Sequence, residues 1–486
     1  MPGRLGVGWC DKLAPHRHEQ VSHLHWEAIM TLWEQLFAHR YVRGDRPLRP
    51  VELAAACLEV TQAKQDALRR FQAQPSKEDS LRELGQWVAD RTRDILSRDW
   101  LRDVQAHLHA QPLPAVAAIR ALAEGLDAAQ GSGLLRLRRA PGRHELQAGE
   151  AISRGGLVYS RLWSPSLLST RPASLGPTRH YLGPDGSAVR ISTAPTRLRS
   201  LSIVPSGDRF VLHCPRRLAF SPDKSLRIAF ALPNRDIPAD FKWRTGEAGN
   251  QPFFEDVTPR RPTEQGERIR KLVKLAKAAT AATGEEDALP DVLVFPELST
   301  RPELATELLS SARPIPLVLA GSYHHEGRNT APFRLAPDVS GVHHKRNRFE
   351  DAALGIERVQ TGQSLHLLSV GDWLICPLIC KDLLDSSTLM NLAQVGCNLV
   401  LVAALTSRTD PFESAASLIG THLQGVTAIC NAAIPPDAAP PAIVAVPMRD
   451  TRRRLSQPKD ASRCGVWTAD IGEKVGSVRW TFAPLE

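Results

Sequence analysis

Apolar residues recur at helical spacing through the first quarter of the chain. Four such series occur before residue 128, and stretches rich in proline and polar residues separate them. A period of 3.6 residues places apolar side chains on one face of a helix. The pattern predicts four amphipathic helices that form a small bundle over about residues 16–128. The third series, for example, consists of Leu81, Leu84, Val88 and Ile95.

After Ser225 the pattern changes to short apolar runs that alternate with helical periods. A buried strand is expected over 226–232, and a helix from about Thr263 presents Ile269, Leu272, Val273 and Ala276 on one face. This alternation predicts an α/β domain with layered sheets and helices. Further helices are expected over 301–312, 386–396 and 412–428, and further strands over 291–297, 316–323, 331–337, 373–380, 398–405, 428–433 and 442–447.

The residues between these parts are rich in proline, serine, glycine and arginine. Two β-like runs, 200–204 and 209–213, are joined by the turn sequence PSGD, which indicates a hairpin. We therefore divide the chain into an N-terminal helical domain (1–130), a linker with short β elements (131–224) and a C-terminal α/β domain (225–486).

Positive charge is concentrated in that linker. The chain has a net charge of +9, and residues 130–220 contain fourteen arginines, no lysine and four acidic residues. Guanidinium groups suit phosphate or an acidic partner, so nucleic acid is one candidate partner. A solvated connector explains the same composition, and both interpretations stay open.

Other residue patterns argue against several classes of protein. The eight cysteines show no C-x-x-C spacing, so we expect reduced thiols without a disulfide framework or zinc site. His16, His18, His23 and His25 lack the spacing of metal ligands and are expected at the surface. No apolar run is long enough to span a membrane, and the first residues lack a signal peptide's apolar core, which predicts a cytoplasmic protein without a membrane partner.

Three residues with reactive side chains end apolar strands or turns of the α/β domain. They are Glu297 in VFPELS, Lys345 in GVHHKRN and Cys380 in LICKDLL. Each alone is expected to be structural, since a free cysteine is among the most buried residue types. Together they supply a thiol nucleophile, a carboxylate base and a fixed cation, which acyl transfer from a carbon–nitrogen bond requires.

These motifs and their order resemble the carbon–nitrogen hydrolase, or nitrilase, superfamily over residues 225–486. The strand LRIAFAL, VFPELS, VLAGSY followed by HHK, ICKDLL and GCNLVLVAA carry the resemblance. It implies an α-β-β-α sandwich, dimers or other homo-oligomers, and no cofactor. It also implies Cys380 as nucleophile, Glu297 as general base and Lys345 as stabiliser of the tetrahedral intermediate. The family's second glutamate is assigned to Glu357, with Glu350 kept open, and Lys381 stands where the family commonly has an aromatic residue.

The sequence thus favours a thiol-dependent hydrolase of an amide, nitrile or carbamoyl compound. The alternative is a catalytically idle or sensing domain in a regulatory protein, whose basic segment engages nucleic acid. Acyl transfer to an amine would use the same residues. The substrate, the oligomeric state and the role of the N-terminal helices are not encoded in any motif that we recognise.

Overall fold

A computed structural model describes most of residues 209–485, with gaps of which 279–288 is the longest. It also describes 75–92, 98–110, 141–147 and a few shorter pieces before residue 209. The expected surface histidines, three of the four predicted helices and the run 200–204 lie wholly or largely outside these residues. The third predicted helix is confirmed as α5 (Pro75–Arg91), and α6 (Arg98–His109), which we did not predict, follows it.

One large sheet carries the strand that leads to Cys380. Its three central parallel strands, β16, β17 and β18, are almost entirely apolar and buried on both faces, as parallel strands covered on both sides should be. In spatial order the sheet contains β1 (Gly142–Gln147), β4 (Arg209–Cys214), β15 (Ser364–Val370), β16 (Trp373–Ile379), β17 (Leu399–Ala404), β18 (Val426–Asn431), β19 (Ala442–Ala445) and β20 (Leu455–Ser456).

The segment expected as a linker thus contributes two strands to this sheet. β4 pairs with β1 in antiparallel and with β15 in parallel orientation. Both edges of residues 209–213 are therefore occupied, by β1 and β15, so the expected hairpin pairing of 209–213 with 200–204 is wrong. The sheet extends back to residue 142, well before the division expected at residue 225.

The second sheet carries the strands that lead to Glu297 and Lys345. Its parallel centre is formed by β5, β8 and β9. In spatial order it contains β10 (Tyr323–His325), β11 (Arg328–Leu335), β9 (Leu317–Leu319), β8 (Val292–Val294), β5 (Ser225–Leu232), β21 (Gly465–Gly472) and β22 (Val478–Pro484), and β12 (Val339–His344) pairs with β11.

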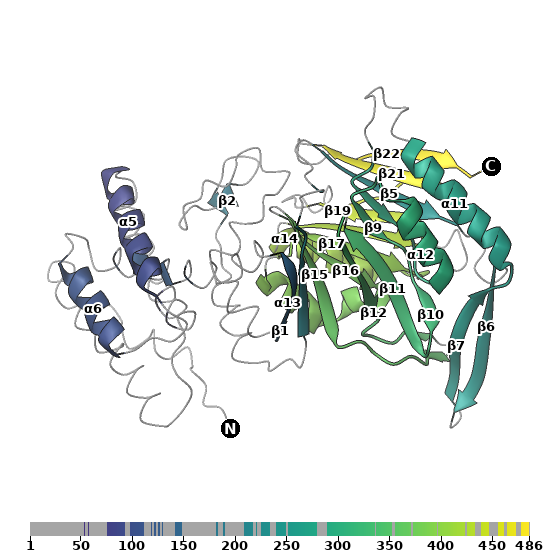
Figure 1. The fold of residues 1–486 in the computed structure, drawn as a ribbon, viewed down its shortest axis with the longest axis horizontal. Coiled ribbons are helices and arrows are strands. Elements are labelled where there is room, and N and C mark those ends of the chain that lie inside the picture. Colours follow the sequence, from purple (N-terminus) through teal and green to yellow (C-terminus); the bar gives the residue numbers. More distant parts are fainter. Residues whose placement is uncertain are drawn as a thin grey trace.

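The two sheets pack face to face and helices cover their outer faces (Figure 1). One apolar cluster joins the inner faces of both sheets, from Phe230 and Val294 to Ile375 and Val402. A second cluster joins α11 (Pro262–Ala278) and α12 (Pro302–Ser311) to the outer face of the second sheet. Helices α13 (Ser386–Val395) and α14 (Asp410–His422) pack on the first sheet. The expected α-β-β-α sandwich is confirmed.

A smaller sheet lies at one end of the sandwich. It consists of β6 (Phe241–Ala248), β7 (Gln251–Pro259), β14 (Gly355–Glu357) and β13 (Glu350–Asp351), and Figure 1 shows the β6–β7 hairpin projecting from the body. We did not predict this hairpin. The predicted helix over 412–428 is too long, because α14 ends at His422 and β18 begins at Val426. Among the described residues no helix has the length and apolar character needed to cross a membrane.

Candidate active site

Glu297 stands just beyond the carboxyl end of β8, in a tight turn between the two sheets. Its amide N–H donates to the carbonyl of Ala404 at the end of β17, at 3.3 Å, so the turn connects the strand ends of both sheets. The next residue, Leu298, has a φ of +53°, a conformation that side chains other than glycine rarely adopt. Such strain persists only where surrounding contacts enforce it, and it is common at functional sites.

Lys345 follows β12 directly and reaches back to two carboxylates. Its Nζ lies 2.7 Å from Oε1 of Glu297 and 2.6 Å from Oε2 of Glu357. All three side chains are at most 3% exposed. The amide group of Asn329 also joins the two acids, because its Nδ2 donates to an oxygen of each at 2.8 Å. The sequence-predicted residues Glu297, Lys345 and Glu357 therefore form one buried ionic cluster.

Cys380 completes this cluster from the opposite sheet. It begins the short helix η3 (Cys380–Leu384) at the end of β16, with a φ of +44°. The thiol is within hydrogen-bonding reach of the Glu297 carboxylate, and its Sγ lies 3.9 Å from the carbonyl oxygen of Leu405. A second residue of this site thus occupies the strained left-handed region. We call Glu297, Lys345, Glu357 and Cys380 the tetrad.

The environment drives the pKa values of the two carboxylates apart. Burial and the neighbouring charge of Glu357 raise the pKa of Glu297, although Lys345 opposes the rise. Burial also acts on Glu357, but Lys345 and His324 outweigh it and hold the pKa of that carboxyl well below its usual range. Burial lowers the pKa of Lys345, yet the two acids more than compensate and raise it. Glu357 therefore balances the Lys345 ammonium, while Glu297 is the group poised to accept a proton.

The thiol is protonated in the resting state. Burial and the Glu297 carboxylate raise the pKa of Cys380 well above its usual value, and Lys345 opposes that rise. Four residues upstream, Cys376 has an equally buried thiol whose pKa is raised by burial, but its neighbours are Cys397, Arg346 and Asp382. Cys380 is hydrogen-bonded to a carboxylate, that of Glu297, whereas Asp382 acts on Cys376 only through its charge, so the two thiols are a matched pair for tests of reactivity.

Asp382 fastens the turn that carries Cys380. Its Oδ1 accepts from the backbone N–H groups of Arg346 and Asn347 at 2.8 and 2.9 Å, and its Oδ2 lies 2.9 Å from Nε2 of His343. These bonds connect η3 to the residues on both sides of Lys345. Cys380 and Lys345 are thereby held close together although they come from different sheets.

The structure adds His324 to the site and excludes Glu350. Val257 donates its N–H to Nδ1 of His324, so the ring proton is on Nε2, which lies 3.0 Å from Oε1 of Glu357. The sequence alone assigned no role to this histidine. Glu350 lies exposed on β13, away from the cluster. Among the described residues, no group of three histidine, cysteine or acidic side chains is arranged to hold a metal ion.

Comparisons with known proteins find similar structures but no similar sequence. No protein-family model and no curated protein matches the chain. Nit3 from Saccharomyces cerevisiae, a member of branch 10 of the nitrilase superfamily, is 13% identical over 52% of this chain and 93% of its own, with a TM-score of 0.36. An amidase from Nesterenkonia sp. is 14% identical over 55% of this chain and 93% of its own, with a TM-score of 0.33.

A larger enzyme matches over part of its length. The glutamine-dependent NAD+ synthetase from Acinetobacter baumannii is 14% identical over 54% of this chain, with a TM-score of 0.35, and the chain spans about half of it, 49%. The likeness is one of overall arrangement at low sequence identity, and solved members of the nitrilase superfamily are among the proteins that share it.

Proposed function

We propose that the chain is a hydrolase that cleaves a non-peptide carbon–nitrogen bond through a thioester on Cys380. The observation that carries the proposal is the buried contact of one thiol, one ammonium and two carboxylates whose pKa values are driven apart. A cluster built only for stability would not need a second acid, because one carboxylate suffices to neutralise Lys345.

The proposed first half of the reaction forms the thioester. Glu297 takes the thiol proton, and Cys380 attacks the carbonyl carbon of an amide. The developing oxyanion is balanced by the Lys345 ammonium and by the backbone N–H of Lys381, since N–H groups in the first turn of a helix have no acceptor within it. Protonated Glu297 then gives its proton to the departing nitrogen, and ammonia or an amine leaves.

The second half releases the product. Glu297, again ionised, takes a proton from a water molecule that attacks the thioester carbon. The tetrahedral intermediate collapses, the acid leaves, and the sulfur regains its proton from Glu297. In this scheme Glu357 does not react. It keeps Lys345 charged and, with Asn329 and His324, holds the ammonium in place.

The test is ammonia release from a panel of short aliphatic amides, together with mass mapping of cysteine adducts after exposure to fluoroacetamide. That compound leaves a covalent acetamide on the active-site cysteine of a variant of the Nesterenkonia amidase. We expect the adduct on Cys380 and not on Cys376, and no turnover in Cys380→Ala. A Cys380 that reacts no faster than Cys376 would contradict the proposal.

A further inference from the structure

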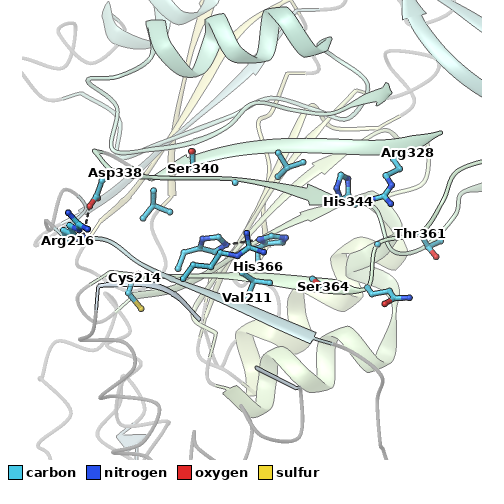
Figure 2. Close-up of a pocket in the computed structure, with 18 residues that line it drawn as sticks. Val211, Cys214, Arg216, Arg328, Asp338, Ser340, His344, Thr361, Ser364 and His366 are labelled. Carbon is cyan, nitrogen blue, oxygen red and sulfur yellow. Dashed lines mark hydrogen bonds between the residues drawn. The ribbon is translucent and has the colours of Figure 1, made fainter. Parts of the chain in front are cut away.

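A cavity of about 1040 Å³ lies apart from the tetrad, where the two sheets diverge (Figure 2). One wall is the β11–β12 hairpin, and the other is formed by β1, β4 and β15. This volume lies at the upper end of the range for small-molecule sites. None of the tetrad residues lines it. Its basic lining residues are Arg143, His213, Arg216, Arg328, His344 and His366.

A pair of buried histidines forms the centre of the cavity. Nε2 of His213 and Nδ1 of His366 lie 3.0 Å apart, so one ring donates to the other. The side chains are 6% and 9% exposed, and both line the cavity. Within the described part of the chain, their outer nitrogens, Nδ1 of His213 and Nε2 of His366, have no hydrogen-bond partner. Because both residues line the cavity, these two nitrogens are available to a ligand inside it.

The charge of the lining selects the sign of that ligand. Three arginines line the cavity against one acid, Asp338, which accepts the backbone N–H of Arg216 at 3.0 Å. Burial, with Arg143 as a second cause, lowers the pKa of His213 to about 4. The histidines are therefore neutral at pH 7, and the lining still carries net positive charge. Such a site repels metal cations and suits oxyanions, which guanidinium groups bind in bidentate fashion.

We infer that this cavity binds a small organic polyanion that carries phosphate or carboxylate groups. Figure 2 shows Arg216 at one end and Arg328 with His344 at the other, so one ligand with two separated anionic groups can contact both ends. The His213–His366 pair offers the ligand one N–H donor in its neutral form, because one of the two outer nitrogens carries a proton and the other a lone pair. Walls from both sheets enclose the cavity. This shape favours a small ligand over nucleic acid, which binds to a more open surface.

Strand β12 places this site next to the active centre. His344 lines the cavity, while the following residue, Lys345, belongs to the tetrad. His343, on the opposite face of the strand, bonds to Asp382, which fastens the Cys380 turn. Gly362 of the cavity lining donates its N–H to the carbonyl of Lys345 at 2.8 Å. A bound anion therefore contacts the strand that positions the ammonium.

The site should take up protons when it is filled. Burial and then the neighbouring groups lower the pKa of His366 to about 2. The charged and titratable groups that face it are Arg143 on β1, His213 on β4, and His343 and His344 on β12. An anion raises the pKa values of the histidines that it contacts. Affinity should therefore increase as the pH falls from 8 to 6.

Isothermal titration of the full chain with inorganic pyrophosphate and with citrate tests the inference and distinguishes phosphate from carboxylate ligands. We expect saturable binding of at least one of them, tighter at pH 6 than at pH 8. Arg143→Ala and Arg328→Ala should each weaken it roughly tenfold. Arg244→Ala, an exposed arginine on β6 outside the cavity, is the matched control and should leave binding unchanged.

Three results would overturn the inference. The first is the absence of binding of both pyrophosphate and citrate at pH 6, and the second is binding that the double variant Arg143→Ala/Arg328→Ala retains. The third is tight binding of a short oligothymidylate that the double variant loses and pyrophosphate fails to displace, because the surface would then belong to nucleic acid. All these variants replace exposed side chains, so circular dichroism should show an unchanged fold.

Discussion

Glu297 and Glu357 share one ammonium, yet their remaining contacts differ. Glu357 accepts from four donors, Lys345, Asn329, His324 and the backbone N–H of Phe349. Glu297 accepts from Lys345 and Asn329 and faces the thiol. Hydrogen bonds to the charged form of an acid stabilise that form. The more heavily bonded acid is therefore fixed as a carboxylate, and the other one is able to cycle its proton.

Replacement of the proton acceptor should suppress the reactivity of the thiol. In Glu297→Gln, alkylation of Cys380 by iodoacetamide should slow by a factor on the order of 10² or more, because the thiol loses its base. The wild-type rate should increase as the pH rises through the raised pKa of Glu297, and the variant should lose that dependence. Peptide mass mapping measures both rates. Cys376 serves as internal control, and an equal slowing of both thiols would contradict the assignment.

The second acid should matter for stability as well as for reactivity. Glu357→Gln leaves a buried ammonium with one charged partner, so the free energy of unfolding should fall by about 3 kcal/mol. Glu297 then becomes the only counter-charge of Lys345, its pKa falls, and the pH dependence of Cys380 alkylation should shift to lower pH. Urea denaturation and the alkylation profile test this. Glu350→Gln, at an exposed position of the same small sheet, should change neither, and a comparable effect of both variants would count against Glu357.

At the scale of elements, the Glu297 turn is held by a close backbone approach. Gly321, between β9 and β10, has a φ of +70°, and a Cβ there would lie 2.2 Å from Oγ of Ser299 and 2.5 Å from the carbonyl oxygen of Pro296. Those atoms belong to the turn that presents Glu297. Glycine is thus required at residue 321 for two reasons. The backbone there has a positive φ, and the turn that carries Glu297 leaves no room for a side chain.

A pair of glycines with the same backbone conformation separates strain from steric overlap. Gly327 also has a φ of +70°, but a Cβ there would meet nothing within 4 Å. Gly327→Ala should therefore cost about 1 kcal/mol of stability, the cost of the left-handed conformation alone. Gly321→Ala should cost at least about 2 kcal/mol more, since overlap is added, and it should also slow Cys380 alkylation. Equal melting temperatures of the two variants would contradict this prediction, because the turn would then have moved to accommodate the added methyl group.

At the scale of the whole molecule, stability should depend on a half-buried acid outside both sites. Asp291 precedes β8 and accepts the backbone N–H of Arg227 on β5 at 2.8 Å. Burial raises its pKa from 3.8 to about 6. A group with a raised pKa in the folded state contributes stability below its unfolded pKa, and this contribution is lost as the pH rises to about 6. Above pH 6 the sandwich therefore contains an unfavourable charge.

Removal of that charge should stabilise the fold at neutral pH. Asp291→Asn keeps an oxygen for the Arg227 N–H and should raise the free energy of unfolding at pH 7.5 by about 1–2 kcal/mol. The gain should shrink as the pH falls from 6 to 4, where the wild-type carboxyl becomes protonated in the native state. Urea titrations of both proteins at pH 7.5 and 4.5 measure the difference. A gain that is the same at both pH values would refute the electrostatic explanation.

Local pattern was sufficient to predict the elements whose partners lie close in sequence or whose burial is complete. The buried face of α11 consists of the expected Ile269, Leu272, Val273 and Ala276 together with Gln265 and Gly266. The sequence likewise singled out Glu297, Lys345 and Cys380 at strand ends, and the structure brings these three residues together. The β6–β7 hairpin was missed because its polar and aromatic residues show no clear two-residue alternation and are stabilised by pairing with β14, about 100 residues later.

By itself, the sequence predicted the alternating central strands and helices after residue 225 and singled out Glu297, Lys345 and Cys380, because these follow from periodicity and residue type. Only the tertiary structure decided that Glu357 and not Glu350 lies beside Lys345, since the choice depends on parallel pairing of Glu357 with Phe254. It also brought His324 to Glu357 and His213 to His366, across 33 and 153 residues. Such contacts are set by the register of the sheets. Register is a long-range property, and the short-range pattern of the sequence carries no information about it.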